Sequence, residues 1–289
     1  MCIINKMIYI YIYIVIMITG CALRNAIEPE MPITETIEFR LLGGSTSHNR
    51  EGIIKGYFVA QGDKAVIYKE AGTELSLYIV NKMLQDLDYN WDEFTNIYGG
   101  ISDNDKNGKV VIMFFDFRGG DSSAFVSSAN NSNWEELGDW RGEIVFMNIK
   151  YIQAEYGNFM CGTLYHELVH LACHTKIMDG EPYGIWSGKT WLFEAIAQSG
   201  TLFVEKPIYY TDIEYNHHYQ TDYTVGTMLF NNLYIDCGSN KNIFKDILNM
   251  RNTNPKNRIR NVIKKYNIKS EIDYEYILNR LPDNGRLNQ

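Results

Sequence analysis

The segment 165–171 has the sequence Tyr-His-Glu-Leu-Val-His-Leu and is the most informative part of the chain. It contains the pattern His-Glu-x-x-His within an apolar run that favours a helix. In a helix, residues four apart lie one turn apart on the same face. His166 and His170 can therefore direct two imidazoles at one metal ion, and Glu167 can reach a water bound to that ion. A buried helix with two hydrogen-bonded histidines is the plainer alternative.

A third ligand is indicated by residues 190–197, which read Thr-Trp-Leu-Phe-Glu-Ala-Ile-Ala and contain Glu194. Catalytic zinc usually takes three protein ligands and keeps one position open. A third histidine ten positions after the first is excluded, because that position is Lys176 and the glycine expected at the bend is Cys173. A carboxylate from a second helix remains, and the gap from His170 to Glu194 (194 − 170 = 24) fits a helix-loop-helix return.

With these residues the chain resembles the gluzincins, the thermolysin-like zinc metallopeptidases with two histidines and a glutamate on zinc. It is more closely similar to the hyicolysin-like bacterial peptidases, in which a Trp-Leu-x-Glu-x-x-Ala segment follows the His-Glu-x-x-His helix. The resemblance extends from about residue 103 to about residue 230. The residue before the ligand glutamate is often Asn in these families and is Phe193 here. Zinc binding need not be weakened by this change, but a hydrogen bond that supports the site or the substrate would be missing.

The resemblance implies a zinc-dependent metalloendopeptidase that acts on a peptide or protein substrate. Zn²⁺ held by His166, His170 and Glu194 would keep one position for water and lower the pKa of that water toward about 7. Glu167 would take the proton as general base and pass it to the leaving amine.

A further catalytic candidate is Tyr223, which begins a Tyr-x-x-Gly pattern at the start of an expected helix. Related gluzincin aminopeptidases use a tyrosine in this context to stabilise the oxyanion, and a packing tyrosine fits the pattern equally well. His217, His218 and Tyr219 are alternative donors, and at most one of the adjacent histidines can face the metal.

Two other classes of function stay open. A lipid-anchored binding or adhesion module with an inactive zinc site is one, and Phe193 is the residue that favours it. An aminopeptidase is the other, but it would need an acidic anchor for the substrate N-terminus, and no Gly-x-Met-Glu-Asn-type segment lies upstream. An endopeptidase is therefore the preferred interpretation.

The composition is that of a globular protein: 289 residues, 45% hydrophobic and 21% charged. The net charge of −8 argues against a nucleic-acid partner, because there is no basic surplus to neutralise phosphates. We expect a monomer.

The N-terminus has the pattern of a targeting segment. Lys6 is the only charge before Arg24, and residues 7–19 form an apolar run apart from tyrosines. This run is too short for a bilayer span, which needs about 20 residues, and suits a signal-peptide core. Gly20-Cys21 at its end resembles a bacterial lipobox, which implies lipidation of Cys21 and a bacterial cell-envelope protein anchored through its lipid on the periplasmic side or the cell surface. An ordinary signal peptide or an uncleaved anchor are the alternatives.

The expected organisation is a signal peptide over residues 1–20, a tether over 21–34, one metallopeptidase domain over 35–282 and a tail over 283–289. Within the domain we expect a two-lobed, zincin-like α+β fold. A mixed β-sheet lobe would extend to about residue 159 with the active-site helix following it, and a helical lobe would begin at about 160.

Individual elements follow from periodicity and turn residues. Strands are expected at 35–42, 53–60, 65–68, 109–117 and 143–148, the second and third as a hairpin and the fourth in the centre of the sheet. The resemblance implies that strand 143–148 is the sheet edge that pairs with substrate, and an edge strand without this role is the alternative. Helices are expected from Thr73 to Leu87, at 92–98, from about 160 to 175, and at 244–250, 258–266 and 271–281.

Three further segments carry expectations of their own. Residues 103–108 resemble the start of a calcium loop, but Phe114 stands where the bidentate glutamate belongs, which favours a tight turn. Residues 119–133 are expected to be a flexible stretch. After removal of Cys2 and lipidation of Cys21, the cysteines are 161, 173 and 237; either of the first two could pair with the third, and buried free thiols are preferred.

Overall fold

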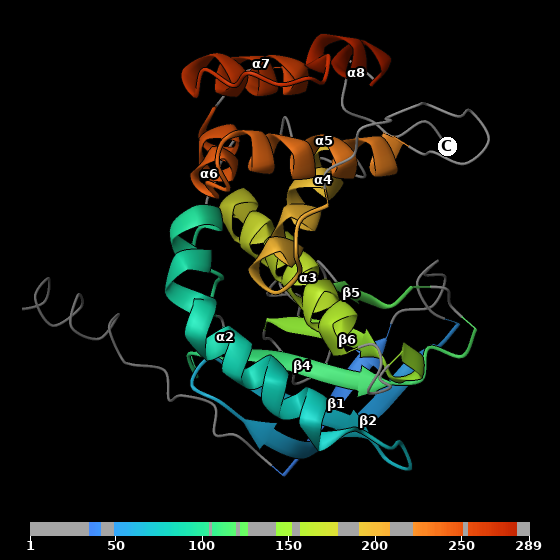
Figure 1. Ribbon diagram of the computed structural model, residues 1–289. Helices are drawn as coiled ribbons and strands as arrows, with labels where there is room; N and C mark the ends of the chain where they lie inside the picture. Colours follow the sequence, from blue (N-terminus) through green and yellow to red (C-terminus); the bar gives the residue numbers. More distant parts are fainter. Residues whose placement is uncertain are drawn as a thin grey trace, which may run out of the picture. The chain divides into compact units, whose positions relative to one another are not determined.

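The computed structural model describes residues 35–41, 49–103, 106–119, 122–126, 143–151, 157–178, 191–208, 222–250 and 254–281. Side chains are described in these ranges except at residues 40, 174–178, 222 and 223. By their contacts, Ile33–Gln289 form one compact unit. Its described residues combine a six-stranded mixed sheet with seven α-helices (Figure 1), which confirms the expected α+β class. The expected signal peptide, tether and lipidation site fall on residues 1–34, outside these ranges.

The sheet has the strand order β1-β2-β3-β4-β6-β5. The first three strands are antiparallel, β3, β4 and β6 are parallel, and β5 runs antiparallel to β6. The expected hairpin is confirmed, because β2 and β3 pair as antiparallel neighbours. The expected central strand is also confirmed, because β4 is buried along its whole length between two neighbours. The strands are β1 (Thr36–Leu41), β2 (Gly52–Gln61), β3 (Ala65–Glu70), β4 (Val110–Phe115), β5 (Ala124–Val126) and β6 (Ile144–Asn148).

Alternate side chains of the buried strands enter two separate cores. Ile112 and Phe114 pack with the helices on one face of the sheet, whereas Val111 and Met113 join an aromatic core on the other. In that second core the rings of Phe39 in β1 and Phe146 in β6 lie 5.9 Å apart. Four inter-strand steps of about 4.8 Å separate these strands along the sheet, so the sheet must curl strongly for the rings to touch.

The helices α2 and α3 pack on the same face of the sheet. The remaining helices lie beyond α3, farther from the sheet (Figure 1). Within the described ranges, no helix has both the length and the apolar character that a membrane crossing requires. The helices are α2 (Leu77–Tyr98), α3 (Gly157–Met178), α4 (Trp191–Ser199), α5 (Asp222–Asp236), α6 (Asn242–Asn249), α7 (Pro255–Lys265) and α8 (Tyr274–Arg280).

The expectation of two helical segments between residues 73 and 98 is wrong, because α2 is one continuous helix. Its N-cap is Ser76, and the Thr73 hydroxyl instead donates to the Glu70 carbonyl in the turn after β3. Tyr89, in the middle of the supposed break, is 88% exposed. The polar stretch around it is the solvent face of a helix.

The expectation that strand 143–148 forms the sheet edge is also wrong. β6 lies between β4 and β5, and all five of its residues are buried. The edge strand is β5, which lies within the stretch 119–133 that was expected to be flexible. Any pairing between the sheet and an extended peptide on this side must therefore involve β5.

The turn before β4 follows the tight-turn interpretation. The Asp103 carboxylate accepts a hydrogen bond from the backbone N–H of Gly108, and Gly108 has a φ of +70°. Asn104 and Asp105, which belong to the calcium-loop pattern, lie outside the described ranges. The closing helices α6, α7 and α8 agree with the three expected near the C-terminus within a few residues.

Candidate metal centre

The helix α3 places both candidate histidines in the interior of the protein. Its side chains are buried on most sides, because it is covered by the sheet, by α2 and by α4. Tyr165 fixes its rotation, since its hydroxyl donates to the Asp86 carbonyl of α2 at 2.8 Å. His166 and His170 lie on the face of α3 that is turned toward α4.

The helix α4 approaches this face closely because two glycines allow it. A Cβ on Gly200, which follows α4, would lie 2.7 Å from the Tyr165 carbonyl oxygen of α3. A Cβ on Gly226 of α5 would lie 3.0 Å from the Ala195 Cβ of α4. The chain thus holds α4 between α3 and α5, and this packing brings Glu194 to the two histidines.

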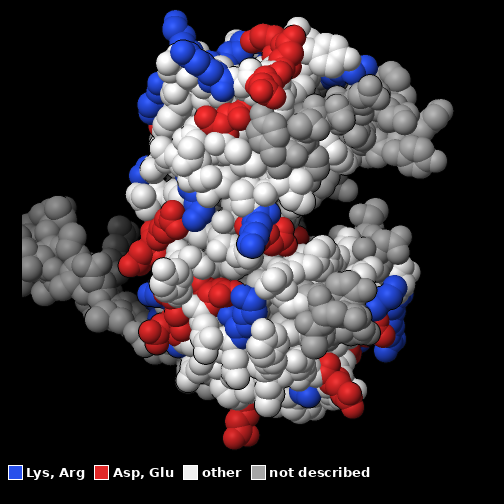
Figure 2. All heavy atoms as spheres, viewed as in Figure 1, with Lys and Arg blue, Asp and Glu red and all other residues white. Residues whose placement is uncertain are grey.

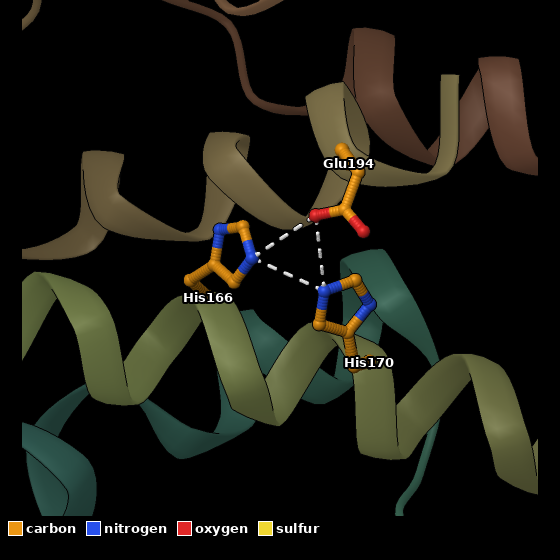
Figure 3. A group of neighbouring side chains, drawn as sticks. All are labelled: His166, His170 and Glu194. Carbon is orange, nitrogen blue, oxygen red and sulfur yellow. Dashed lines mark hydrogen bonds and ion pairs between the residues drawn. The ribbon is translucent and has the colours of Figure 1, made fainter. Parts of the chain in front are cut away.

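Figure 3 shows the three side chains pointing toward one another from α3 and α4. The Nε2 atoms of His166 and His170 are 3.1 Å apart, and Glu194 Oε2 is 3.5 Å from each of them. The site is partly accessible, with side-chain exposures of 12%, 9% and 19% for His166, His170 and Glu194. This is the one group of potential metal ligands found among the described residues.

The geometry of these three atoms fits zinc. Zinc binds imidazole nitrogen and carboxylate oxygen at about 2.0–2.2 Å in a tetrahedron, which separates neighbouring ligand atoms by about 3.3–3.5 Å. The observed separations of 3.1, 3.5 and 3.5 Å are close to these values. Atoms that present lone pairs to one another repel unless a proton or a cation lies among them. Two imidazoles and one carboxylate are also a ligand set that leaves a fourth position open.

The electrostatics of the site favour a negatively charged Glu194. Burial acts to raise the pKa of this carboxyl, but hydrogen bonds and positive charge from His166 and His170 outweigh burial and hold the pKa well below its usual value. For His166, burial acts to lower the pKa, but hydrogen bonds to Glu194 and Gln198 and the negative charges of Glu167 and Glu194 together outweigh it, so that the pKa is raised. The site therefore attracts positive charge to the point where the three ligand atoms meet.

Glu167 lies beside the ligands and is buried, with 7% of its surface exposed. Burial raises the pKa of its carboxyl, and His170 and His166 lower it without reversing the shift. A hydrogen bond from the backbone of Val126 in β5 also reaches this carboxyl. A carboxyl with a raised pKa, beside a metal site and next to the edge strand, has the properties of a general base.

The remaining expected site residues are placed only in part. Tyr223 lies in the first turn of α5, as expected, but its side chain falls outside the described residues, as do Cys21 and residues 217–219. Among the described cysteines none forms a disulfide: Cys161 and Cys173 are buried free thiols and Cys237 is half-buried.

One residue of the site was missed by the sequence interpretation. The Gln198 amide oxygen is 3.2 Å from His166 Nδ1, on the side of the ring away from the ligand triangle. Gln198 is four residues after Glu194 in α4, so that one helix face carries both. The i, i+4 spacing from the glutamate was the signal that could have identified it.

Figure 2 shows acidic and basic side chains interspersed over the face in view, and the described atoms of this face form no broad positive area. The chain matches no protein-family model and no curated protein.

Proposed function

We propose that the chain is a zinc-dependent metalloendopeptidase of the gluzincin type, with a zincin-like fold. The observation that carries this proposal is the convergence of His166 Nε2, His170 Nε2 and Glu194 Oε2 at separations of 3.1–3.5 Å. Structural zinc sites use four protein ligands, whereas three ligands leave a position open for water. Glu167 beside these ligands supplies the proton acceptor that hydrolysis needs.

Bound zinc would supply Lewis-acid activation of water and of the substrate carbonyl. His166, His170 and Glu194 would hold the ion. Glu167 would accept a proton from the attacking water at its carboxylate and return it to the leaving amine. Tyr223 at the start of α5 remains the candidate donor to the oxyanion.

The edge strand β5 is the part of the sheet best placed to hold a peptide substrate. Its Val126 backbone is hydrogen-bonded to Glu167, so the strand passes directly beside the proposed base. An extended peptide can add to a sheet edge through its backbone groups, largely independent of its sequence. A peptide that pairs with β5 would run past the metal site, which suits cleavage within a chain.

The test uses purified protein with and without zinc. We expect close to one zinc per chain and cleavage of unfolded casein that a chelator abolishes. Glu167→Gln should retain zinc and lose at least about 10²-fold of the cleavage rate, because the proton acceptor is gone. Glu275→Gln, an exposed change on α8, is the matched control and should cleave normally.

Full cleavage by the Glu167→Gln variant would remove Glu167 from the mechanism. Zinc binding without any cleavage of peptides would favour the alternative of a binding or adhesion module with an inactive site. Cut sites confined to the N-terminal residue of each peptide would favour an aminopeptidase.

Lipid anchoring through Cys21 in a bacterial envelope belongs to the same proposal and rests on the sequence pattern at residues 7–21. Labelling with a radioactive fatty acid in a bacterial host should mark the intact protein and leave a Cys21→Ser variant unlabelled. Equal labelling of both would place the lipid elsewhere.

A further inference from the structure

The two histidines of the metal centre are supported unequally. On the outer side of His166, the Nδ1–H can donate to the Gln198 amide oxygen at 3.2 Å. This hydrogen bond fixes the tautomer that leaves Nε2 free to bind metal. Since Gln198 and Glu194 share one face of α4, the same helix supplies a ligand and the support of another ligand.

The outer side of His170 has no such support. Its Nδ1 is buried and has no hydrogen-bond partner in the described part of the chain. The ring of Phe193 packs against this imidazole, with the ring centroids 4.4 Å apart and the planes tilted by 41°. A phenyl ring has no lone pair to accept the N–H, and buried donors without an acceptor are rare in proteins.

We propose that Phe193 limits the zinc affinity of this site and that Gln198 is a positioning residue for His166. The inference rests on the proposed zinc site. His170 must keep a proton on Nδ1 when its Nε2 binds metal, and among the residues that the structure describes that proton has no acceptor. The centre therefore binds zinc more weakly than a site with the same three ligand atoms and an acceptor beside each histidine.

A small change at position 193 can repair this defect. The oxygen of an asparagine side chain lies one bond beyond Cγ, at the distance from the backbone where the Phe193 ring begins. An asparagine or glutamine at this position can thus offer a carbonyl oxygen to the buried N–H, while a leucine fills similar space without an acceptor.

The experiment measures the zinc dissociation constant of the intact protein by competition with a chromophoric chelator. Phe193→Asn or Phe193→Gln should bind zinc about 10-fold more tightly than the wild type, and Phe193→Leu should not. Gln198→Ala should bind about 10- to 100-fold more weakly, and Gln198→Glu should restore binding. Circular dichroism of the metal-free proteins checks that each variant is folded.

A spectroscopic signature separates positioning from general destabilisation. In NMR spectra of the zinc-loaded protein, the His166 Nδ1–H should exchange slowly with solvent in the wild type because it donates to Gln198, and the Gln198→Ala variant should lose this protection.

Equal zinc affinities for folded Phe193→Asn, Phe193→Gln and Phe193→Leu would overturn the role of Phe193. An unchanged affinity and an unchanged exchange rate of the His166 Nδ1–H in Gln198→Ala would overturn the role of Gln198. Both results differ from a failure of the proposed function, in which the wild type itself binds no zinc, or binds it equally well after His166→Ala.

Discussion

Gly200→Ala should loosen the packing that carries Glu194 to the histidines. The new Cβ would lie 2.7 Å from the Tyr165 carbonyl oxygen and 2.9 Å from Val169 Cγ2, both on α3. An ordinary contact needs about 3.4 Å, so the segment after α4 must move by about 0.7 Å away from a backbone atom that cannot yield easily. Overpacking of this kind costs about 1–3 kcal/mol of unfolding free energy.

The same displacement would disturb the metal site. Ligand distances tolerate about 0.2 Å, and a shift of about 0.7 Å at the end of α4 exceeds this tolerance if α4 moves as a rigid body. We therefore expect a lower melting temperature, by about 2–12 °C for a domain of this size, together with weaker zinc binding.

Thermal unfolding followed by circular dichroism and zinc competition titration measure the two effects. Gly100→Ala is the matched control, because nothing lies within 4 Å of its added Cβ and its φ is not positive. If Gly200→Ala melts at the temperature of the control and binds zinc as the wild type does, the close approach of α4 to α3 does not position Glu194.

Three further results are expected. Zinc at about 100 times its dissociation constant should stabilise the fold by about 2.7 kcal/mol, and a chelator should remove this gain in a melting experiment. Burial raises the pKa of the Cys161 thiol to about 12 and also raises the pKa of the Tyr98 phenol, so both groups keep their protons in the folded state. The thiol contribution should then be fully present well below pH 9, the ordinary pKa of the unfolded thiol, and stability should fall as the pH rises from about 9 toward about 12, with a smaller fall in Cys161→Ala. Arg258→Leu should cost about 1–3 kcal/mol in denaturant titrations, because the buried guanidinium donates to two carbonyls at the end of α6. Arg260→Leu should cost less than about 1 kcal/mol, because it removes only a partly exposed ion pair with Glu275.

The candidate ligand set was predictable because it depends on spacing and on the resemblance of the segment around Glu194. Two histidines four apart must share a helix face, and a carboxylate in a second apolar helix can reach them after a loop. What joins the helices was not predictable from one sequence. Gly200 and Gly226 are ordinary glycines in the sequence, and only the structure identifies the backbone and side-chain atoms that they avoid.

The errors in the sheet also have physical causes. β6 is apolar at four of five positions, a pattern typical of a strand buried on both faces, but the family resemblance was given more weight than the pattern. β5 is only three residues long and lies in a polar stretch, so its alternation is too short to detect. The site residue Gln198 was overlooked because a glutamine on a helix is usually solvent-exposed.

The ring contact between Phe39 and Phe146 also has a consequence for how the chain acquires its structure. It joins segments separated by roughly a hundred positions. The aromatic face of β1 therefore cannot be fully covered until β6 has been synthesised. Until then that face is open to water and to other nascent chains. We expect slow maturation and a dependence on chaperones during biogenesis.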